Sequence, residues 1–587
     1  MFLKTAKVKG KEYIRIVKSY RDEEGKVKHK TIASLGSVDN LVNLFPFFDK
    51  LIEKYIGHKY TSIENINKKE NATIYNYGYI VIKEMWNKYD LGEFFERIFK
   101  NKKVQFDIVK TIFTLVINRA LKSELSKLGY FKRKDIFLML NEELKHQELY
   151  KTLDYLEEIK EELEDYLLKK SINLFNRDLT VTFFDVTTLY FESKIEDEDI
   201  NVLEILNYTT TNPKYKLQAV RLDTLQTLLT KEKMLKGLRK FGLSKDFKMN
   251  DTQIVLSLLI DKDGIPITFD IYEGNKAETK TLIDTIDRLK KRFNLEKVTV
   301  VADRGISRWL NLEEIKKRGY EYIVAIRFKR QKELENKILN KLDYNLISFN
   351  DNEGYYGYKE FIITQTKKVK ENNKFKNITL KHKIISTYSD KRAAKDKKDR
   401  DKEIAKLHKK LQNGSAVKKS KYLKVNNSSI NDNNNCNLSY EIDFAKIEED
   451  RKYDGFYAIA SSDTSITPLE AINIHNNIYE IENSFRDLKS SLNIRPIYHY
   501  KKERIKGHII ASFLAYFLLK NIQYKLSNSK KFNQYLTQNN ETLSIDKIVE
   551  SLNSINCVKV DINDNNYYIK IKHSTFASKI IDTLKIK

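Results

Sequence analysis

Three acidic residues that lie far apart in the chain stand where a carboxylate could bind a metal ion: Asp185, Asp303 and Glu482. Hard divalent cations such as Mg²⁺ prefer carboxylate oxygens that a rigid frame holds in place. Phosphoryl transfer on nucleic acid commonly uses two such ions about 4 Å apart, one at the attacking oxygen and one at the leaving oxygen. If the fold brings the three carboxylates together, the sequence predicts a site for that chemistry.

Asp185 and Asp303 both belong to runs with the composition of buried β-strands. Asp185 lies in LTVTFFDVTTLYF, where both faces are largely apolar or β-branched, as in a central strand. A carboxylate there is costly to bury unless it binds a metal ion or has a hydrogen-bonding or charged partner. The alternative to metal binding is therefore a backbone or lysine partner. Asp303 ends the run KVTVVAD, at the carboxyl end of its strand, where ligands bind in open α/β sheets. A helix-cap or turn role is the alternative for Asp303.

Glu482 lies in a predicted helix that Thr467 can cap and that has Pro468 at its first helical position. Apolar residues then recur at helical spacing and predict one stripe facing a core: Ile474, Ile478, Ile481, Phe485, Leu488 and Leu492. Glu482 is at the edge of this stripe, with Arg486 and Lys489 four and seven residues further on and on the same side. This arrangement suits a metal ligand beside a phosphate, and a solvated Glu–Arg pair is the alternative.

The order of elements between residues 180 and 330 predicts a mixed α/β domain. Three strands come first, and the second and third, TQIVLSLLI and IPITFDIY, are joined by a turn at residues 261–264. A helix, the strand that ends in Asp303, a second helix and the strand YEYIVAIRF follow. The order βββαβαβ is that of an RNase H-like fold, although other small mixed α/β domains have similar strings.

The rest of the chain frames this α/β region. Residues 1–36 predict a hairpin around a turn at residues 22–25, and residues 37–175 have a helical pattern that includes FDIVKTIFTLVINRALKSEL. After the last core strand come short β-like runs, a charged helix from Lys391 to Lys410 and an Asn-rich tract. The predicted domains are 1–175 (hairpin and helical domain, whose basic residues suit DNA binding, with a purely structural role as the alternative), 176–327 (first part of the core), 328–460 (β-rich insertion with a basic helix), 461–525 (last part of the core) and 526–587 (C-terminal tail).

The charge balance points to a polyanionic partner. Lys and Arg number 107 against 81 acids, a formal net charge of +26, and neutralising nucleic-acid phosphates would release counterions. An AT-rich coding bias, which raises Lys and Asn, is the alternative source of the basic residues. The two cysteines support neither a disulfide framework nor a zinc site, so we expect a cytoplasmic, nucleoid-associated protein. The most apolar stretch, residues 509–519, is too short to span a bilayer and predicts a buried core helix rather than a membrane contact.

Four stretches of the chain together resemble a known family. They are FFDVTTLYFES, GLSKDFKMNDTQIVLSLLIDKDGIPITFDIYEGNKAETKTL, VADRGISRWLNLEEIKKRGYEYIVAIR and IYEIENSFRDLKSSLNIRPIYHYKKERIKGHI. In order and spacing they resemble the DDE transposases of the insertion-sequence-four group, and most closely its sixteen-thirty-four branch. The resemblance covers most of residues 180–330 and 465–515. The gap between Asp303 and Glu482 is similar to the one that holds the β-rich insertion in such transposases.

The resemblance implies a role for individual residues. Asp185, Asp303 and Glu482 would be the catalytic triad that holds Mg²⁺ or Mn²⁺, as two ions. Lys489 matches the lysine of the family's Y-R-E-K signature, whose Tyr and Arg fall here on His475 and Ile478 and so depart from it. The DNA-contact candidates are Lys489, Arg486, Arg495, His475, Tyr479 and Arg304, with Tyr479 the nearest aromatic substitute for the signature's Tyr.

The resulting hypothesis is a transposase of a bacterial insertion sequence that binds terminal inverted repeats and performs cut-and-paste strand cleavage and strand transfer. The resemblance implies double-stranded DNA, of the element ends and of the target, as its partner, and a homodimer in the synaptic complex. Two alternatives remain open. One is a metal-dependent nuclease on the same fold with no transfer step. The other is a catalytically inactive protein that has been repurposed for DNA binding.

Overall fold

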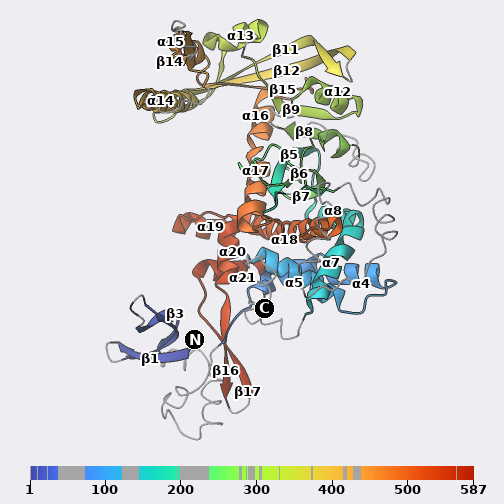
Figure 1. Ribbon diagram of the computed structural model, residues 1–587, viewed down its shortest axis with the longest axis vertical. Coiled ribbons are helices and arrows are strands. Elements are labelled where there is room, and N and C mark those ends of the chain that lie inside the picture. Colours follow the sequence, from blue (N-terminus) through green and yellow to red (C-terminus); the bar gives the residue numbers. More distant parts are fainter. Residues whose placement is uncertain are drawn as a thin grey trace, which may run out of the picture.

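The computed structural model describes most of the chain (Figure 1). The residues that it leaves undescribed are 1, 9–10, 23, 25, 38–72, 122–143, 195, 198–236, 277–280, 286, 288–297, 303–306, 330, 372–373, 414–419, 428–437, 563–564 and 587. Asp303, Arg304 and most of the Asn-rich tract lie among them, as does the stretch 41–56 that we predicted to be helical. The molecule is elongated, with the insertion elements at one end and the hairpin β16–β17 at the other (Figure 1).

A nine-stranded mixed sheet forms the centre of the molecule, in the order β10-β11-β12-β15-β9-β8-β5-β6-β7. Its core strands are β5 (Val181–Tyr190), β6 (Gln253–Asp261), β7 (Pro266–Glu273), β8 (Thr299–Ala302) and β9 (Glu321–Ala325). β5 pairs antiparallel with β6 and parallel with β8, while β7 and β9 extend the sheet antiparallel and parallel respectively. This is the strand order that the predicted RNase H-like fold requires, with the strand of Asp185 in the middle.

The two faces of the core sheet are covered by different helices. Phe183 and Leu189 of β5 pack into the same core cluster as α17 and α18, whereas Phe184 and Val186 pack with α12 (Trp309–Lys317) in a second cluster. Since side chains alternate along a strand, Asp185 belongs to the face of Phe183, toward α17. Both faces of β5 are buried, as its β-branched and aromatic composition predicted.

Four strands of the predicted insertion extend the core sheet, and two others form a small hairpin of their own. β10 (Asn345–Asn350), β11 (Gly354–Glu371), β12 (Lys374–Ser389) and β15 (Phe456–Ser461) add to the edge at β9, to which β15 pairs. The charged helix α14 (Asp390–Gln412) begins where predicted, with the Ser389 side chain accepting from the Arg392 amide. It lies among α13 (Lys332–Leu339), α15 (Phe444–Arg451) and the small hairpin β13 (Leu423–Asn427) and β14 (Leu438–Ile442) (Figure 1).

The single helix predicted after Thr467 is in fact interrupted. Thr467 caps α16 (Pro468–Asn476) as expected, its side chain accepting from the Glu470 amide. The chain then turns at residues 477–478 and resumes as α17 (Tyr479–Arg486), which passes directly into a π-helical turn, η4 (Asp487–Ser491). The apolar stripe did not reveal these breaks because most of its residues are buried on both sides of them. The wider π turn changes which residues share a helix face after Arg486.

Residues from both ends of the chain fold together around α18. The N-terminal part holds the sheet β1 (Phe2–Val8), β2 (Lys11–Arg21) and β3 (Val27–Ser37), then β4 (Thr73–Asn76), α3 (Tyr79–Lys88), α4 (Leu91–Phe99), α5 (Ile108–Ala120), α7 (His146–Glu158) and α8 (Lys160–Phe175). The predicted hairpin is therefore confirmed as β2–β3. The C-terminal part holds α19 (Lys530–Asn539), α20 (Ile545–Asn553), β16 (Asn556–Ile562), β17 (Asn565–Lys570) and α21 (Thr575–Leu584), and β16 pairs with β4.

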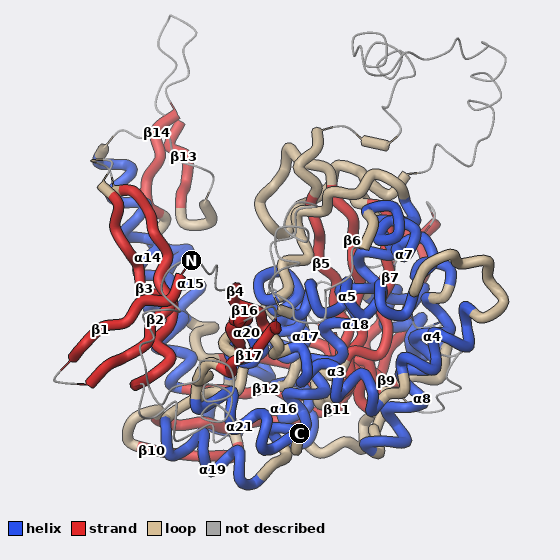
Figure 2. The backbone as a smooth tube through the Cα atoms, turned by 90° about the horizontal axis from the view of Figure 1, so that it is seen from below, coloured by secondary structure: helices blue, strands red, loops and turns tan. Residues whose placement is uncertain are grey.

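The apolar helix α18 (Lys502–Ser527) is the central support of the helical part (Figure 2). Among the described residues it is the one helix long and apolar enough to cross a membrane, yet 94% of its apolar window is buried inside the protein. It packs against α5 and α7 on one side and against β7 of the sheet on another. The prediction of a buried core helix is confirmed.

Gly507 lets α18 approach α7 closely, and this generates a test of the packing. A Cβ at this position would stand 2.1 Å from the carbonyl oxygen of Leu153, a backbone atom that cannot move aside cheaply. Gly507→Ala should therefore destabilise the protein by about 1–3 kcal/mol, the usual cost of overpacking. A thermal unfolding midpoint several degrees below wild type is the expected result.

Gly92→Ala is the matched control for Gly507→Ala. Gly92 also lies in a helix, α4, but a Cβ there would meet only the Trp86 indole nitrogen at an ordinary 3.8 Å. Its midpoint should stay at or above the wild-type value because alanine favours helix by up to about 1 kcal/mol. Equal midpoints for the two variants would show that the α18–α7 approach has been misplaced.

Candidate active site

Asp185 is held in the middle of the sheet by strands on both sides. Its Cα partner on β6 is Leu258, and two residues earlier Phe183 pairs with Val301 of the parallel strand β8. The Asp185 side chain is 23% exposed, and its Oδ1 lies 3.8 Å from the Lys245 ammonium. The carboxylate is thus half-buried, next to a cation, and open on the α17 side of the sheet. The lysine partner foreseen as an alternative exists, although a contact at 3.8 Å with partial exposure is weak.

Glu482 reaches the same side of the sheet from α17. This helix packs against β5 and β6. Ile481, Ser484 and Phe485 are buried, while Glu482 is exposed. Asp185 and Glu482 are therefore carried by two elements that touch. Their sequence separation of nearly three hundred residues is closed by the packing of one helix on one strand.

The third predicted ligand cannot be placed. Asp303 follows directly after β8, the parallel neighbour of β5, but residues 303–306 lie outside the described part of the chain, and so does Arg304. Within the described part no group of three or more His, Cys, Asp or Glu side chains could hold a metal ion. The triad Asp185, Asp303 and Glu482 therefore stays a prediction, with two members on adjoining elements.

Lys489 and Arg495 are joined through one carboxylate, that of Asp246. The Lys489 ammonium donates to Asp246 Oδ1 at 3.0 Å, and Arg495 Nη1 lies 2.8 Å from Oδ2. The side chains of Lys489 and Asp246 are about nine-tenths buried, and burial lowers the pKa of Lys489 below its ordinary value while Asp246 opposes that shift. The Arg495 guanidinium also lies 5.6 Å from the centre of the Tyr190 ring, at the end of β5.

The segment that carries Asp246 is attached to the strand of Asp185. The Lys245 ammonium donates to the Val186 carbonyl at 2.6 Å, and the Lys245 amide donates to Thr188 Oγ1 at 2.9 Å. Lys489 and Arg495 are thereby fixed close to Asp185. Sequence reasoning missed Lys245 and Asp246, although both lie in the stretch GLSKDFKMND that carried the family resemblance.

The other candidate DNA contacts differ in exposure. Arg486 is exposed and Tyr479 is half-exposed on α17, so both are accessible from solvent on the helix of Glu482. His475 is buried on α16, with its ring 5.5 Å from that of Tyr457. The prediction that His475 contacts DNA stays a prediction, although its side chain is buried in this structure. Ile478, the other departure from the signature, is partly buried.

Arg119 of α5 holds the segment that follows η4. Its guanidinium donates to the carbonyls of Leu492 and Asn493, at 3.2 and 2.9 Å, and lies 3.3 Å from His508 Nδ1. Arg119 is buried, and that burial lowers the pKa of Arg119 to about 9. Because the same segment continues to Arg495, the helical region contributes to the position of a predicted phosphate contact.

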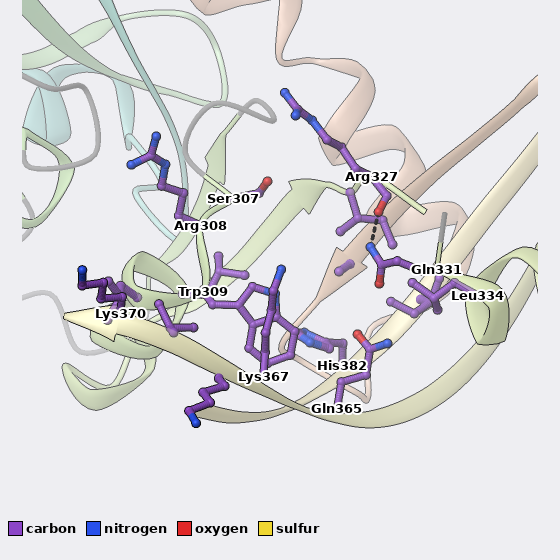
Figure 3. Close-up of a pocket in the computed structure, with 17 residues that line it drawn as sticks. Ser307, Arg308, Trp309, Arg327, Gln331, Leu334, Gln365, Lys367, Lys370 and His382 are labelled. Atoms are coloured by element: carbon purple, nitrogen blue, oxygen red, sulfur yellow. Dashed lines mark hydrogen bonds between the residues drawn. The ribbon is translucent and has the colours of Figure 1, made fainter. Parts of the chain in front are cut away.

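A basic cavity of about 770 Å³ opens just after the Asp303 segment (Figure 3). It lies between the start of α12, the end of β9 and the hairpin β11–β12, and its cationic lining residues are Arg308, Arg327, Lys367, Lys368 and Lys370. Trp309 lies at its centre, with the Lys367 ammonium 5.9 Å from its ring and His382 edge-on at 5.8 Å. The Gln331 amide donates to the Arg327 carbonyl at its rim (Figure 3). Sequence reasoning did not single out this cavity, because its lining comes from segments far apart in the chain.

Comparison with known families decides the identity. Residues 251–518 match the family described as transposase DDE domain, and residues 3–62 match the IS1634 family transposase N-terminal domain. The chain belongs to the IS1634 family of DDE transposases. The two matches together span more than half of the chain, and the first includes β6 through α18, with Asp303 and Glu482 inside it.

Other comparisons add little to this assignment. Among curated proteins, none matches the transposase. Among solved structures, the cryo-EM structure of the piggyBac transposase synaptic complex with hairpin DNA is similar, at 8% sequence identity and a TM-score of 0.32, covering 81% of this chain and 78% of that chain. A likeness of that size is too low to define a fold or a function.

Asp487 gives the helix of Glu482 a pH-sensitive support. It opens the turn η4, is 8% exposed, and burial raises the pKa of its carboxyl to about 7, against the opposing effects of Lys520 and Arg486. Asp546 and Glu480 add to the upward shift. The folded transposase thus retains a proton that the unfolded chain releases above pH 4. The proton on Asp487 stabilises the folded protein fully at a pH below the pKa that Asp487 has in the unfolded chain. This stabilisation is lost as the pH rises through about 7, the pKa of Asp487 in the folded protein.

Asp487→Asn should remove this pH dependence. The amide mimics the protonated carboxyl without titrating, so the variant should have the higher thermal midpoint at both pH 5 and pH 8, and by the larger margin at pH 8. The difference should amount to a few kcal/mol, at about 1.4 kcal/mol per pKa unit. Midpoints measured at both pH values test this, with Asp401→Asn on the exposed face of α14 as the control that leaves the profile unchanged. Identical profiles for Asp487→Asn and wild type would contradict the assignment.

Proposed function

We propose that this transposase cleaves DNA at the terminal inverted repeats of a bacterial insertion sequence and joins the freed ends to target DNA. The observation that carries the proposal is the placement of Asp185 and Glu482 on contacting elements, on one side of the sheet, with Lys245, Lys489 and Arg495 close by. Carboxylates next to fixed cations suit a reaction in which a phosphodiester must be bound and divalent ions must be held.

The donor set fits a hard divalent cation. Asp185 offers a half-buried carboxylate from a rigid strand, Glu482 offers an exposed one from a packed helix, and Asp303 would complete the set from the strand next to Asp185. These residues would hold two Mg²⁺ or Mn²⁺ ions, which would supply Lewis-acid activation of the attacking oxygen and charge stabilisation at the leaving oxygen. The contact between Lys245 and Asp185 is weak enough for a metal ion to replace it.

The cations around the site would bind the DNA backbone. Lys489 and Arg495 are fixed by Asp246, so they would meet a phosphate without losing much side-chain freedom, while Arg486 is exposed and adaptable. Arg304 stays a candidate by sequence alone, and Tyr479 is accessible to a base or sugar. The basic cavity beside Trp309 is lined from the α12 face of the sheet, opposite the face of Asp185, so it is separate from this surface.

The order of events follows from the chemistry of phosphodiesters. Water attacks the phosphorus at the end of the element and the 3′ oxygen leaves with a proton, giving a free 3′-hydroxyl. That hydroxyl then attacks a phosphodiester of the target, and the displaced 3′ oxygen takes up the proton. Joining two element ends in this way calls for a dimer on DNA, and residues 1–175 would help to recognise the terminal repeats. We place the reaction in the cytoplasm, at the nucleoid.

Two other functions remain possible on the same site. A nuclease without transfer would stop after the first attack, and a repurposed DNA-binding protein would need no acids. The two transposase families that the chain matches favour the first proposal, as do the two acids on adjoining elements. A strand-transfer product separates the transposase from both alternatives, because neither of them forms it.

The decisive test removes one carboxylate and leaves its surroundings intact. Glu482→Gln should lower Mg²⁺-dependent cleavage of a terminal-repeat duplex by at least about a thousandfold, as removing a member of a catalytic unit commonly does. Binding of the same duplex should persist, since Glu482 lies exposed beside basic residues rather than inside the fold. Asp185→Ala should behave in the same way, and EDTA should abolish cleavage by wild type.

Glu470→Gln is the control for the glutamate substitution. Glu470 is also an exposed helical glutamate, one helix earlier on α16, and its replacement should leave cleavage unchanged. Cleavage by Glu482→Gln at the rate of the Glu470→Gln control would refute the proposed triad. Products that are cut but never joined to target DNA would favour the nuclease.

A further inference from the structure

A short loop just before β6 exposes an unusual amount of apolar surface. This loop, residues 241–249, is called the SKD loop after the Ser244-Lys245-Asp246 at its centre. Within nine residues it exposes four large apolar side chains, at Phe241 (36%), Leu243 (83%), Phe247 (89%) and Met249 (49%). Single exposed apolar residues need no explanation, but a group of them on one loop marks an interaction surface.

The loop is fixed in place, so these side chains are presented rigidly. Ser244 is buried, and its Oγ accepts from the amides of Asp246 and Lys248 at 3.2 and 3.1 Å. Lys245 is tied to the backbone of β5, and Asp246 to Lys489 and Arg495, as described above. Two polar residues of the loop thus point inward, toward the strand of Asp185, while Leu243 and Phe247 on either side of them point to solvent.

Phe247 has a backbone conformation that an exposed loop would normally avoid. Its φ of +59° lies in the left-handed region, which disfavours residues with a bulky side chain. Such a conformation persists where the surroundings enforce it, and it is often found at functional sites. Here the inward hydrogen bonds and ion pairs of residues 244–246 enforce it, and the result is an aromatic ring directed away from the protein.

The charges around the loop identify the kind of partner. Lys248 lies in the loop itself, with its ammonium 5.5 Å from the Tyr190 ring, and Lys245, Lys489 and Arg495 lie at its base. An apolar tip within a ring of cations matches DNA, whose apolar base faces lie between lines of phosphates. A second copy of the chain fits less well, because a symmetric contact at this loop would bring the same cations face to face.

We propose that the SKD loop is a wedge, in which Phe247, with Leu243 beside it, inserts between base pairs next to the phosphate at the Asp185 site. Phe, Leu and Met are among the side chains that insert between base steps and unstack them. Unstacking there gives the scissile strand the freedom to enter a site that lies on the surface of a sheet. The inference rests on the proposed function, since it places the cut beside Asp185.

The wedge is tested with 2-aminopurine, an adenine analogue whose fluorescence rises when it is unstacked. It is placed in turn at each base step around the cleaved phosphate of a terminal-repeat duplex, and binding is measured in EDTA so that no cleavage occurs. Wild type should raise the fluorescence at one or two steps. Phe247→Ala should bind the duplex without that rise, and Phe247→Trp should restore it.

Cleavage in Mg²⁺ provides the second readout. Phe247→Ala should cut a fully paired duplex at least about tenfold more slowly, because unstacking a step costs a few kcal/mol. A duplex with a mismatch at the responsive step should restore the rate, since the wedge is then no longer needed. Phe444→Ala, which removes another exposed ring (69%) from α15, is the matched control and should behave as wild type.

The outcomes separate this inference from the function on which it rests. Equal fluorescence and equal cleavage for Phe247→Ala and wild type would overturn the wedge, as would loss of dimers by Phe247→Ala in sedimentation with the fluorescence rise intact. Wild type that unstacks the duplex in EDTA but does not cut it in Mg²⁺ would overturn the proposed catalysis and leave the wedge standing.

Discussion

The structure depends on accommodating a carboxylate on an interior strand of a sheet. Asp185 has paired strands on both sides and apolar layers on both faces of its strand. An ionised group in that position is tolerated only next to cations or water. The surroundings of Asp185 meet this need on one side of the sheet alone, where the side chain is partly exposed, Lys245 lies close and α17 brings Glu482. The site therefore lies on the side of the sheet where a carboxylate can contact solvent and a cation.

Much of the molecule away from this site serves to keep its cations in place. Lys489 and Arg495 depend on Asp246, Asp246 lies in a loop tied to β5, and the segment before Arg495 is held by the buried Arg119. Arg119 comes from α5, which packs on α18 together with α7. The pairing of β4 with β16 connects the N-terminal helices to the C-terminal tail, so one core joins segments from both ends of the chain to the catalytic sheet.

Local patterns in the chain predicted some of these features well and others poorly. Four features follow from short-range rules of periodicity, turns and capping. They are the hairpin β2–β3, the succession of strands along the chain from β5 to β9, the cap at Thr467 and the burial of α18. The interruption between α16 and α17, with the burial of His475, was missed because a stripe of apolar residues continues across it. The roles of Lys245 and Asp246 were missed because each is an ordinary surface residue type until its partners are known.

By itself, the sequence determined which residues can do chemistry, which elements carry them and which family they resemble, because residue type, periodicity and motif spacing are local properties. Only the tertiary structure decided that the insertion strands continue the core sheet, that Asp246 joins Lys489 to Arg495, and that the SKD loop is tied to the strand of Asp185 with Phe247 exposed. Those facts depend on contacts between residues far apart in the chain. Such contacts form only when burying two faces together outweighs the entropy of closing the loops between them, and no short stretch of sequence records that balance.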